Sequence, residues 1–172
     1  ARHDAVAWGY ARAADQLGVD IIQNCEVLDY LWSGDRVVGV KTTRGDIGAG
    51  KVAAAVAGHT SVLAQKAGLR LPIESHVLQA FVSESIKPVV HHVVVWSATY
   101  FYVSQSDKGG LVFGGHIDRY NSYAQRGNLA NIAETTQGLA SLIPFAARLR
   151  LLRHWGGIMD MTPDGSPIIT TT

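Results

Sequence analysis

The chain has 172 residues, of which 47% are hydrophobic and 17% charged, and its formal net charge is +1. This composition predicts a globular protein with a hydrophobic core, made of one domain or of one domain and part of another. The basic residues are scattered and no apolar run approaches about 20 residues, so we expect neither nucleic-acid nor membrane binding. The single cysteine, Cys25, excludes an internal disulfide and fits a reducing, cytoplasmic compartment.

The N-terminal part of the chain predicts a helix and a small β-meander. Apolar residues recur at helical spacing from Asp4 to Leu17, and Gly18 follows as a stop signal. Residues 19–31 predict a strand, and residues 36–43 predict its antiparallel partner. The chain starts on a helical pattern and stops inside a strand-like one at Pro167–Thr170, so we expect a piece of a longer protein.

A run of small apolar residues, Val52–Ala57, predicts a strand buried on both faces. Gly58 follows it and permits an unusual backbone angle or the close approach of a ligand. Thr60 or Ser61 is expected to cap a short helix. Since α/β proteins hold cofactors where a buried strand leads through glycine into a helix, we expect this stretch to face one.

From Leu71 onward the pattern becomes that of an antiparallel sheet with turn residues at its corners. An amphipathic helix is predicted over Asn128–Leu142, and Thr162–Gly165 predicts a tight turn. Strands or extended segments are predicted over residues 72–84, 92–97, 100–105, 111–114 and 148–161.

The sequence gives little support for a metal site or for hydrolase chemistry. His91 and His92 are adjacent in the sequence, so in a strand their side chains would point to opposite faces. Since the chain also has only one cysteine, we expect no metal site. No G-x-S-x-G elbow is present. The glycines of Gly45–Gly50 follow GxxGxG, a turn-like spacing, in place of the dinucleotide spacing GxGxxG. His116 follows Phe113-Gly-Gly115 at a predicted strand end, where a functional and a structural role both stay open.

Three sets of residues resemble a known family. Residues 34–61 resemble the meander and strand of FAD-dependent amine and amino-acid oxidases of the D-amino-acid oxidase type. Trp155–Pro167 resembles the strand that returns to their FAD domain. Four further stretches resemble the β subunits of heterotetrameric sarcosine oxidases: Ala1–Arg12, Leu71–His76, Tyr102–Gly109 and Tyr120–Gly127.

The resemblance implies oxidative demethylation of sarcosine, a small amine, to glycine by FAD within a hetero-oligomer. It also implies a covalent FMN on a histidine at a subunit junction, and the match places that histidine at His3. The FAD contacts that carry over are the Val27 backbone and the segment Ala57, Gly58 and His59. On the substrate side, the resemblance implies that His116 and Tyr102 face the flavin ring as catalytic residues.

Two departures from the family pattern are informative. Glycine- and D-amino-acid-type oxidases have a carboxylate-binding arginine after the Trp-x-Gly-x stretch, whereas Met159 follows Trp155-Gly-Gly-Ile158 here. This difference favours the sarcosine type. The GxGxxG unit that seats the FAD pyrophosphate is absent from the sequence, so we expect this chain alone neither to bind FAD tightly nor to turn over.

The predicted fold is α/β (α+β), with a partial FAD-binding domain that contains a β-meander and an antiparallel-sheet substrate domain. The expected domains are residues 1–70 for the first and 71–149 for the second, with 150–172 as the return segment. One alternative function is another FAD-dependent secondary-amine or amino-acid oxidase or dehydrogenase, of the dimethylglycine type. Another is a non-catalytic binding or assembly module.

Overall fold

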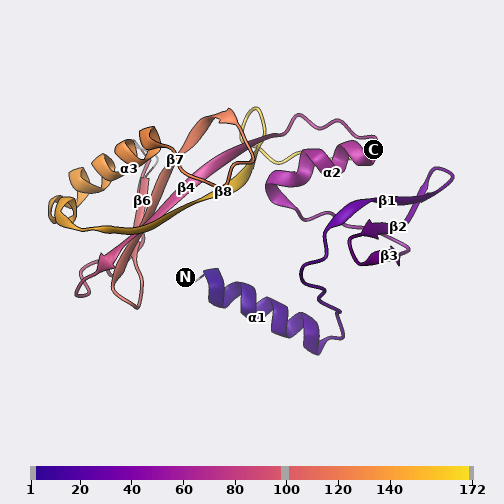
Figure 1. Cartoon of the computed structure of the whole chain (residues 1–172), viewed down its shortest axis with the longest axis horizontal. Helices are drawn as coiled ribbons and strands as arrows, with labels where there is room; N and C mark the ends of the chain where they lie inside the picture. Colours follow the sequence, from indigo (N-terminus) through magenta and orange to yellow (C-terminus); the bar gives the residue numbers. More distant parts are fainter. Residues whose placement is uncertain (1–2, 98–100, 171–172) are drawn as a thin grey trace. The chain divides into compact units, whose positions relative to one another are not determined.

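The computed structural model describes residues 3–97 and 101–170, and the chain divides into two compact units, residues 1–53 and 54–172 (Figure 1). The predicted mixture of helices and antiparallel sheets is confirmed. No helix among the described residues is long and apolar enough to cross a membrane.

The first unit contains a helix and the predicted meander. Helix α1 spans His3–Gln16 and is followed by a turn at Gly18, whose φ of +83° suits a residue without a side chain. The three strands of the meander pair in the antiparallel order β1-β2-β3. Their bounds are Val27–Ser33 for β1, Arg36–Thr42 for β2 and Gly45–Gly48 for β3.

The prediction of a strand from residue 19 is wrong over residues 19–26. These residues form turns and irregular chain, and the strand begins only at Val27. Asn24 has a φ of +52°, which lies outside the extended region and interrupts any strand there. The apolar residues of this segment therefore do not form a strand, because the backbone turns at Asn24.

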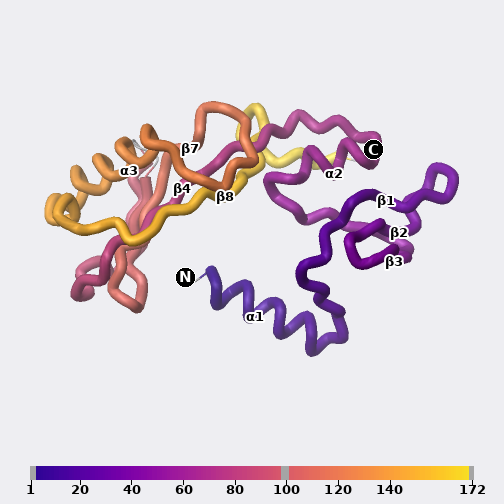
Figure 2. Tube along the Cα trace, viewed as in Figure 1, coloured from indigo at the N-terminus to yellow at the C-terminus, as the bar shows by residue number. Residues whose placement is uncertain are grey.

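The second unit is a five-stranded sheet with helices on one face. The strand order is β5-β6-β7-β4-β8, and every neighbouring pair is antiparallel. Figure 2 shows the trace of β8 running beside that of β4, although the two strands are far apart in the sequence. The strands are β4 Glu74–Ser85, β5 Val94–Trp96, β6 Phe101–Gln105, β7 Gly110–Asn121 and β8 Leu151–Met161.

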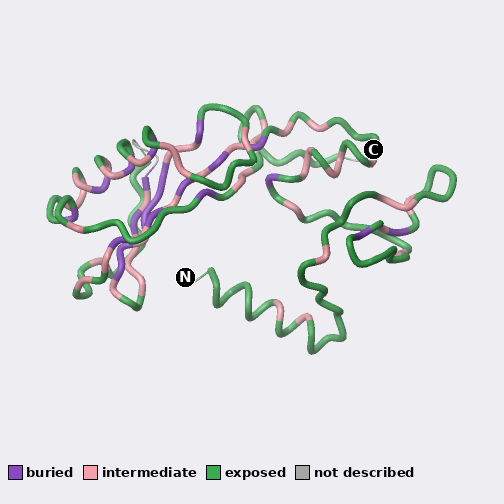
Figure 3. Tube along the Cα trace, viewed as in Figure 1, coloured by how far each residue is buried: buried purple, intermediate pink, exposed green. Residues whose placement is uncertain are grey.

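The hydrophobic core lies between this sheet and two helical segments. Helix α3 spans Leu129–Leu142, and the 3-10 helix η3 spans Pro144–Arg148. The predicted helix over Asn128–Leu142 is therefore confirmed, with Asn128 as its N-cap. Figure 3 shows the buried residues gathered where α3 covers the strands. The core cluster is Phe81, Phe101, Val103, Leu111, Phe113, Leu139 and Ala146.

The stretch predicted as a buried strand has a different structure. Residues 52–56 form no regular element and are mostly exposed, and Ala57–His59 form a 3-10 helix, η1. A strand requires a neighbour for its backbone groups, and among the described residues no strand pairs with this segment. Ala57 also has a φ of +43°, which ends any extended run.

Helix α2 follows as Thr60–Lys66, so the predicted start at Thr60 is confirmed but its side-chain cap is not. The N-cap residue is His59, without a side-chain hydrogen bond, and the Thr60 hydroxyl donates to the Ala57 carbonyl at 2.5 Å. At the other end of the chain, the turn at Thr162–Gly165 is confirmed by a backbone hydrogen bond of 3.2 Å. The strand predicted over Pro167–Thr170 is absent, and these residues are irregular.

Strand β7 continues past its predicted end at Gly114 to Asn121, and a β-bulge interrupts its pairing with β4 on the way. Gln79 pairs with Gly115, but Leu78 pairs with Ile117, so His116 has no partner on β4. His116 has a φ of +46°, which is typical of a bulge residue. The bulge resets the alternation of side chains along the rest of β7.

Beyond the bulge, Asp118 is turned into the core and only 4% exposed. Its Oδ1 accepts hydrogen bonds from the side-chain amides of Gln79 at 3.0 Å, Asn128 at 2.6 Å and Asn131 at 2.5 Å. Asn128 in turn caps α3 by accepting from the Asn131 backbone N–H at 2.9 Å. One carboxylate therefore joins β4, β7 and the start of α3.

We predict that Asp118→Ala destabilises the protein by about 3 kcal/mol or more, because buried amide donors lose their acceptor. Urea unfolding followed by circular dichroism measures the change. Asp160→Ala, at an exposed carboxylate on β8, is the matched control and should cost less than ~0.5 kcal/mol. Equal losses for the two variants would show that the Asp118 hydrogen bonds contribute little.

Candidate functional site

The sheet of the second unit has one covered and one open face. Along β4, alternate residues from Ser75 to Ser83 are buried, and three of them, Val77, Gln79 and Phe81, are fully buried. The residues between them are half-buried and point to the opposite side. We call that side the open face; on β4 it carries His76, Leu78, Ala80 and Val82.

A row of cross-strand neighbours crosses the open face at Ala80. Ala80 pairs with Trp155 on one side and Gly114 on the other, and Gly114 pairs with Tyr102. Residues directly opposite in antiparallel strands point to the same face. Trp155 is 41% exposed, so an aromatic residue stands on each side of two small residues.

The Tyr102 side chain lies close to the surface of the sheet on this face. A Cβ atom at Gly114 would lie 2.8 Å from Tyr102 Oη, so the phenol occupies the space above the glycine. Burial raises the pKa of the Tyr102 phenol above its ordinary value of 10.0. Among the described residues, no hydrogen-bond partner reaches this hydroxyl. It is therefore a neutral donor available to a ligand.

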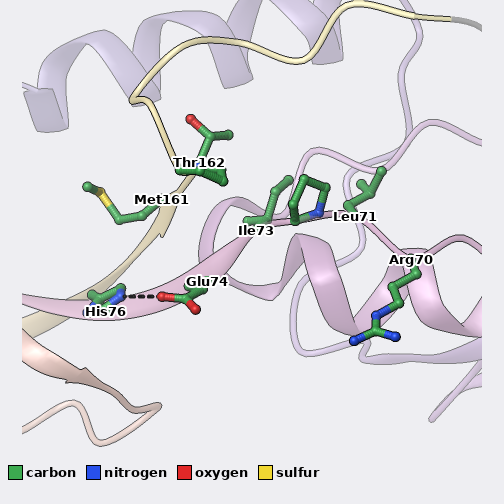
Figure 4. A pocket seen from close by; sticks show the side chains of 9 residues that line it. Arg70, Leu71, Ile73, Glu74, His76, Met161 and Thr162 are labelled. Carbon is green, nitrogen blue, oxygen red and sulfur yellow. Dashed lines mark hydrogen bonds and ion pairs between the residues drawn. The ribbon is translucent and has the colours of Figure 1, made fainter.

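The same face leads to a pocket of about 790 Å³ at the start of β4 and the end of β8 (Figure 4). The pairs His76–Met159 and Glu74–Met161 bring the two strands together there. The walls combine apolar and charged side chains, including those of Arg70, Leu71, Ile73, Glu74, His76 and Met161.

The His76 ring in this pocket is held at both nitrogens. Nδ1 lies 2.8 Å from the Asp118 carbonyl oxygen, which can only accept, so Nδ1 carries a proton. Nε2 lies 3.3 Å from Glu74 Oε2, and the His76 side chain is 16% exposed. The pocket thus contains a fixed imidazole beside a carboxylate. Among the described residues, no group of three or more His, Cys, Asp or Glu side chains is arranged to hold a metal ion.

None of the predicted site residues lines this pocket. The sequence assigned no site role to Arg70, Glu74 or His76. Alternation places Glu74 and His76 on one face of a strand, which the sequence pattern allows. Their meeting with Met161 depends on the register between β4 and β8, which no local pattern indicates.

The segment Ala57–His59 packs against the sheet of its own unit. Gly58 is buried, and its carbonyl accepts a hydrogen bond from the Ser75 hydroxyl at 2.5 Å. Ile158 of β8 fills the space where a Gly58 side chain would stand. The close approach predicted at Gly58 is therefore made by Ile158, and the unusual backbone angle is at Ala57 instead. The His59 ring stacks on Tyr123 with centroids 5.2 Å apart.

The structure does not bring His116 and Tyr102 to one face. His116 is turned toward α3, with Nδ1 3.4 Å from Glu134 Oε2, whereas Tyr102 lies on the open face. The expected position of His116 at a strand end is also wrong, because β7 continues to Asn121. Of the two residues, only Tyr102 is on the side that α3 leaves uncovered.

The two remaining predicted residues are in the first unit. His3 is the first residue of α1 and is exposed. Val27 is the first residue of β1 and is 36% exposed. Both are accessible, and each begins a regular element.

We predict that Tyr102 makes stability depend on alkaline pH. Its folded-state pKa lies above 10.0, so the unfolded chain ionises first as the pH rises, and the Tyr102 contribution to stability is lost above that value. Below pH 10 this group should cause no pH dependence. Urea midpoints of wild type and Tyr102→Phe should therefore differ by a constant amount below pH 10 and diverge above it. Parallel curves throughout would contradict the burial of the phenol.

Comparison with known proteins gives a family match over the whole chain. The family described as FAD dependent oxidoreductase (DAO) matches residues 1–172. Sarcosine oxidase subunit beta of Rhizobium meliloti (strain 1021) is 64% identical over 171 residues, which are 99% of this chain and 41% of that protein. The same subunit of an Arthrobacter species is 56% identical over 172 residues, 100% of this chain and 42% of that protein. The chain thus spans about two fifths of these relatives.

A solved structure has the same fold. L-proline dehydrogenase from P. horikoshii superposes with a TM-score of 0.85 at 26% sequence identity, covering 95% of this chain and 45% of that one. The order of strands and helices described above is therefore shared with a larger protein of known structure.

Proposed function

Because the chain belongs to the FAD-dependent oxidoreductase (DAO) family, we propose that it is part of the β subunit of a sarcosine oxidase, which demethylates sarcosine to glycine. The observation that carries this proposal is the identity of 56–64% to sarcosine oxidase β subunits along essentially the whole chain. The name of these relatives supports a hetero-oligomer with other subunits as partners. The absence of a membrane-spanning helix among the described residues is consistent with the cytoplasmic location that we propose.

The open face supports a role as one wall of the substrate site. It has a neutral hydroxyl donor at Tyr102, a partly exposed indole at Trp155 and small residues between them. Such a surface can hold a small amine by contact with its methyl group while the phenol donates to a polar atom of the ligand. We propose residues 71–149 as the substrate side and residues 1–70 as the FAD side, with 150–172 as the segment that contributes Trp155 to the substrate wall and then returns to the FAD side.

The chain has part of the surface that FAD would need. The backbone of residues 52–56 is mostly exposed, and among the described residues no strand pairs with it, so a strand from elsewhere in the subunit can pair there. We propose that the segment Ala57, Gly58 and His59, which directly follows this backbone in the sequence, contacts FAD. We propose the same for the Val27 backbone, as the family resemblance implies. When bound, FAD would take a hydride equivalent from the N-methyl carbon.

Met159 favours the sarcosine type over the glycine oxidase type. It pairs on the open face with His76, which lines the pocket, and it stands where the resemblance places a carboxylate-binding arginine in glycine oxidases. A thioether cannot pair with an anion. The nearest alternative is a dimethylglycine-type oxidase or dehydrogenase, and a non-catalytic assembly module is the alternative from another class.

The complete β subunit, assembled with its partner subunits, should oxidise sarcosine faster than dimethylglycine or glycine, as measured by oxygen consumption. Activity on dimethylglycine alone would select the alternative enzyme, and bound flavin without turnover of any amine would favour the assembly module. The 172-residue chain by itself should show no flavin absorbance after gel filtration with FAD. Retained flavin would contradict our view that this chain holds only part of the cofactor site.

We further propose that His3 carries a covalent FMN at the junction with another subunit. His3 is exposed at the start of α1, which leaves its ring accessible for attachment. His3→Ala in the assembled protein should abolish the flavin that stays with the β subunit after acid denaturation. His91→Ala, at another exposed histidine, is the matched control and should retain it. Flavin that remains bound to His3→Ala would assign the attachment to a different residue.

A further inference from the structure

The position of the Tyr102 phenol depends on residue 114 being a glycine, which has no side chain. Tyr102 and Gly114 are direct partners on β6 and β7. A Cβ atom at Gly114 would lie 2.8 Å from Tyr102 Oη and 2.9 Å from Tyr102 Cε1, both far inside normal contact distance. The ring therefore lies flat across β7, over its own cross-strand partner, and does not stand upright from the sheet.

Gly114 does not serve a backbone conformation that needs glycine. Its φ is not among the positive values, in contrast to those of Gly109 and Gly165. Gly157, which lies beside Leu78 on the same open face, has nothing within 4 Å of the place where its Cβ would stand. The lack of a side chain is thus a steric requirement at Gly114 and not at Gly157.

The flat phenol has no hydrogen-bond partner among the described residues. Its ring is half-buried on the open face, next to the small residue Ala80 across Gly114. A hydroxyl left unpaired in such surroundings gains free energy when a ligand oxygen accepts from it, and most from a charged oxygen. The direction of the ring places this donor near the centre of the row that ends at Trp155.

We propose that Gly114 is a positioning residue that holds the Tyr102 hydroxyl low on the open face, where it donates to a carboxylate oxygen of the substrate. The inference rests on the proposed function, because it assigns the substrate to this face. It adds that recognition needs a neutral phenol in one orientation. A larger residue at position 114 lifts the ring into solvent and removes the donor from the ligand.

The test uses the complete β subunit in its complex, labelled with 3-fluorotyrosine. The 19F resonance of Tyr102 is the one that Tyr102→Phe lacks, and its titration reports the phenol without any substrate. Gly114→Ala should move this resonance and lower the phenol pKa toward that of an exposed tyrosine. It should also raise KM for sarcosine by about tenfold, the effect of losing one hydrogen bond to a charged group.

Two variants separate positioning from a general disturbance of the sheet. A Cβ at Gly114 would also lie 2.7 Å from the Gln79 carbonyl oxygen, so some strain on β4 is expected. Gly110→Ala is matched to it, because that Cβ would lie 3.0 Å from the Ser83 carbonyl on the same strand pair, and Tyr102 is not among its nearest atoms. Gly157→Ala is the unstrained control. Both should leave the Tyr102 resonance unchanged, and Gly110→Ala, at the end of β7 where it pairs with Ser85, should also leave KM unchanged.

If Gly114→Ala does not fold, Ala80→Val supplies a second test, because Ala80 is the cross-strand partner of Gly114 on β4 and a larger side chain there crowds the space above Gly114 without adding a Cβ at Gly114. A Tyr102 titration that is unchanged in Gly114→Ala, or in Ala80→Val, would overturn the inference. A shifted titration in an enzyme that does not oxidise sarcosine would overturn the proposed function while the positioning role of Gly114 stands.

Discussion

The second unit depends on the buried carboxylate of Asp118. Its Oδ1 accepts from amides on β4, on the loop that caps α3 and on α3 itself. A buried charge is stable only where it is fully hydrogen-bonded, so the three amides and the carboxylate require one another. This network fixes where α3 begins, and α3 decides which face of the sheet is covered.

The position of α3 also determines which residues lie on the open face. Once α3 covers the side with Phe81 and Phe113, alternation leaves Ala80, Tyr102 and Trp155 on the other side. The bulge at His116 serves the covered side, because it turns Asp118 into the core and directs the imidazole toward Glu134 of α3. The face that we assign to substrate is thus the consequence of a polar contact on the opposite side of the sheet.

The sequence predicted those elements whose signals are local. Alternation along β4, the Asn128 cap of α3 and the turn at Thr162–Gly165 all depend on neighbouring residues. The strand predicted over residues 52–57 failed because a strand depends on its partner as much as on its own residues. The pocket at Arg70 and His76 was missed for a related reason, since the register of β4 with β8 creates it.

Gly58 and Gly114 show how one sequence signal can have different meanings. Both are glycines with no positive φ, and each admits a neighbouring side chain, Ile158 in one case and Tyr102 in the other. Ile158 is an apolar side chain, so the space at Gly58 is used for packing. The Tyr102 phenol has a donor without a partner among the described residues, so the space at Gly114 sets the direction of a group that can act on a ligand. The chemistry of the inserted side chain, and not the glycine itself, therefore separates a structural position from a functional one.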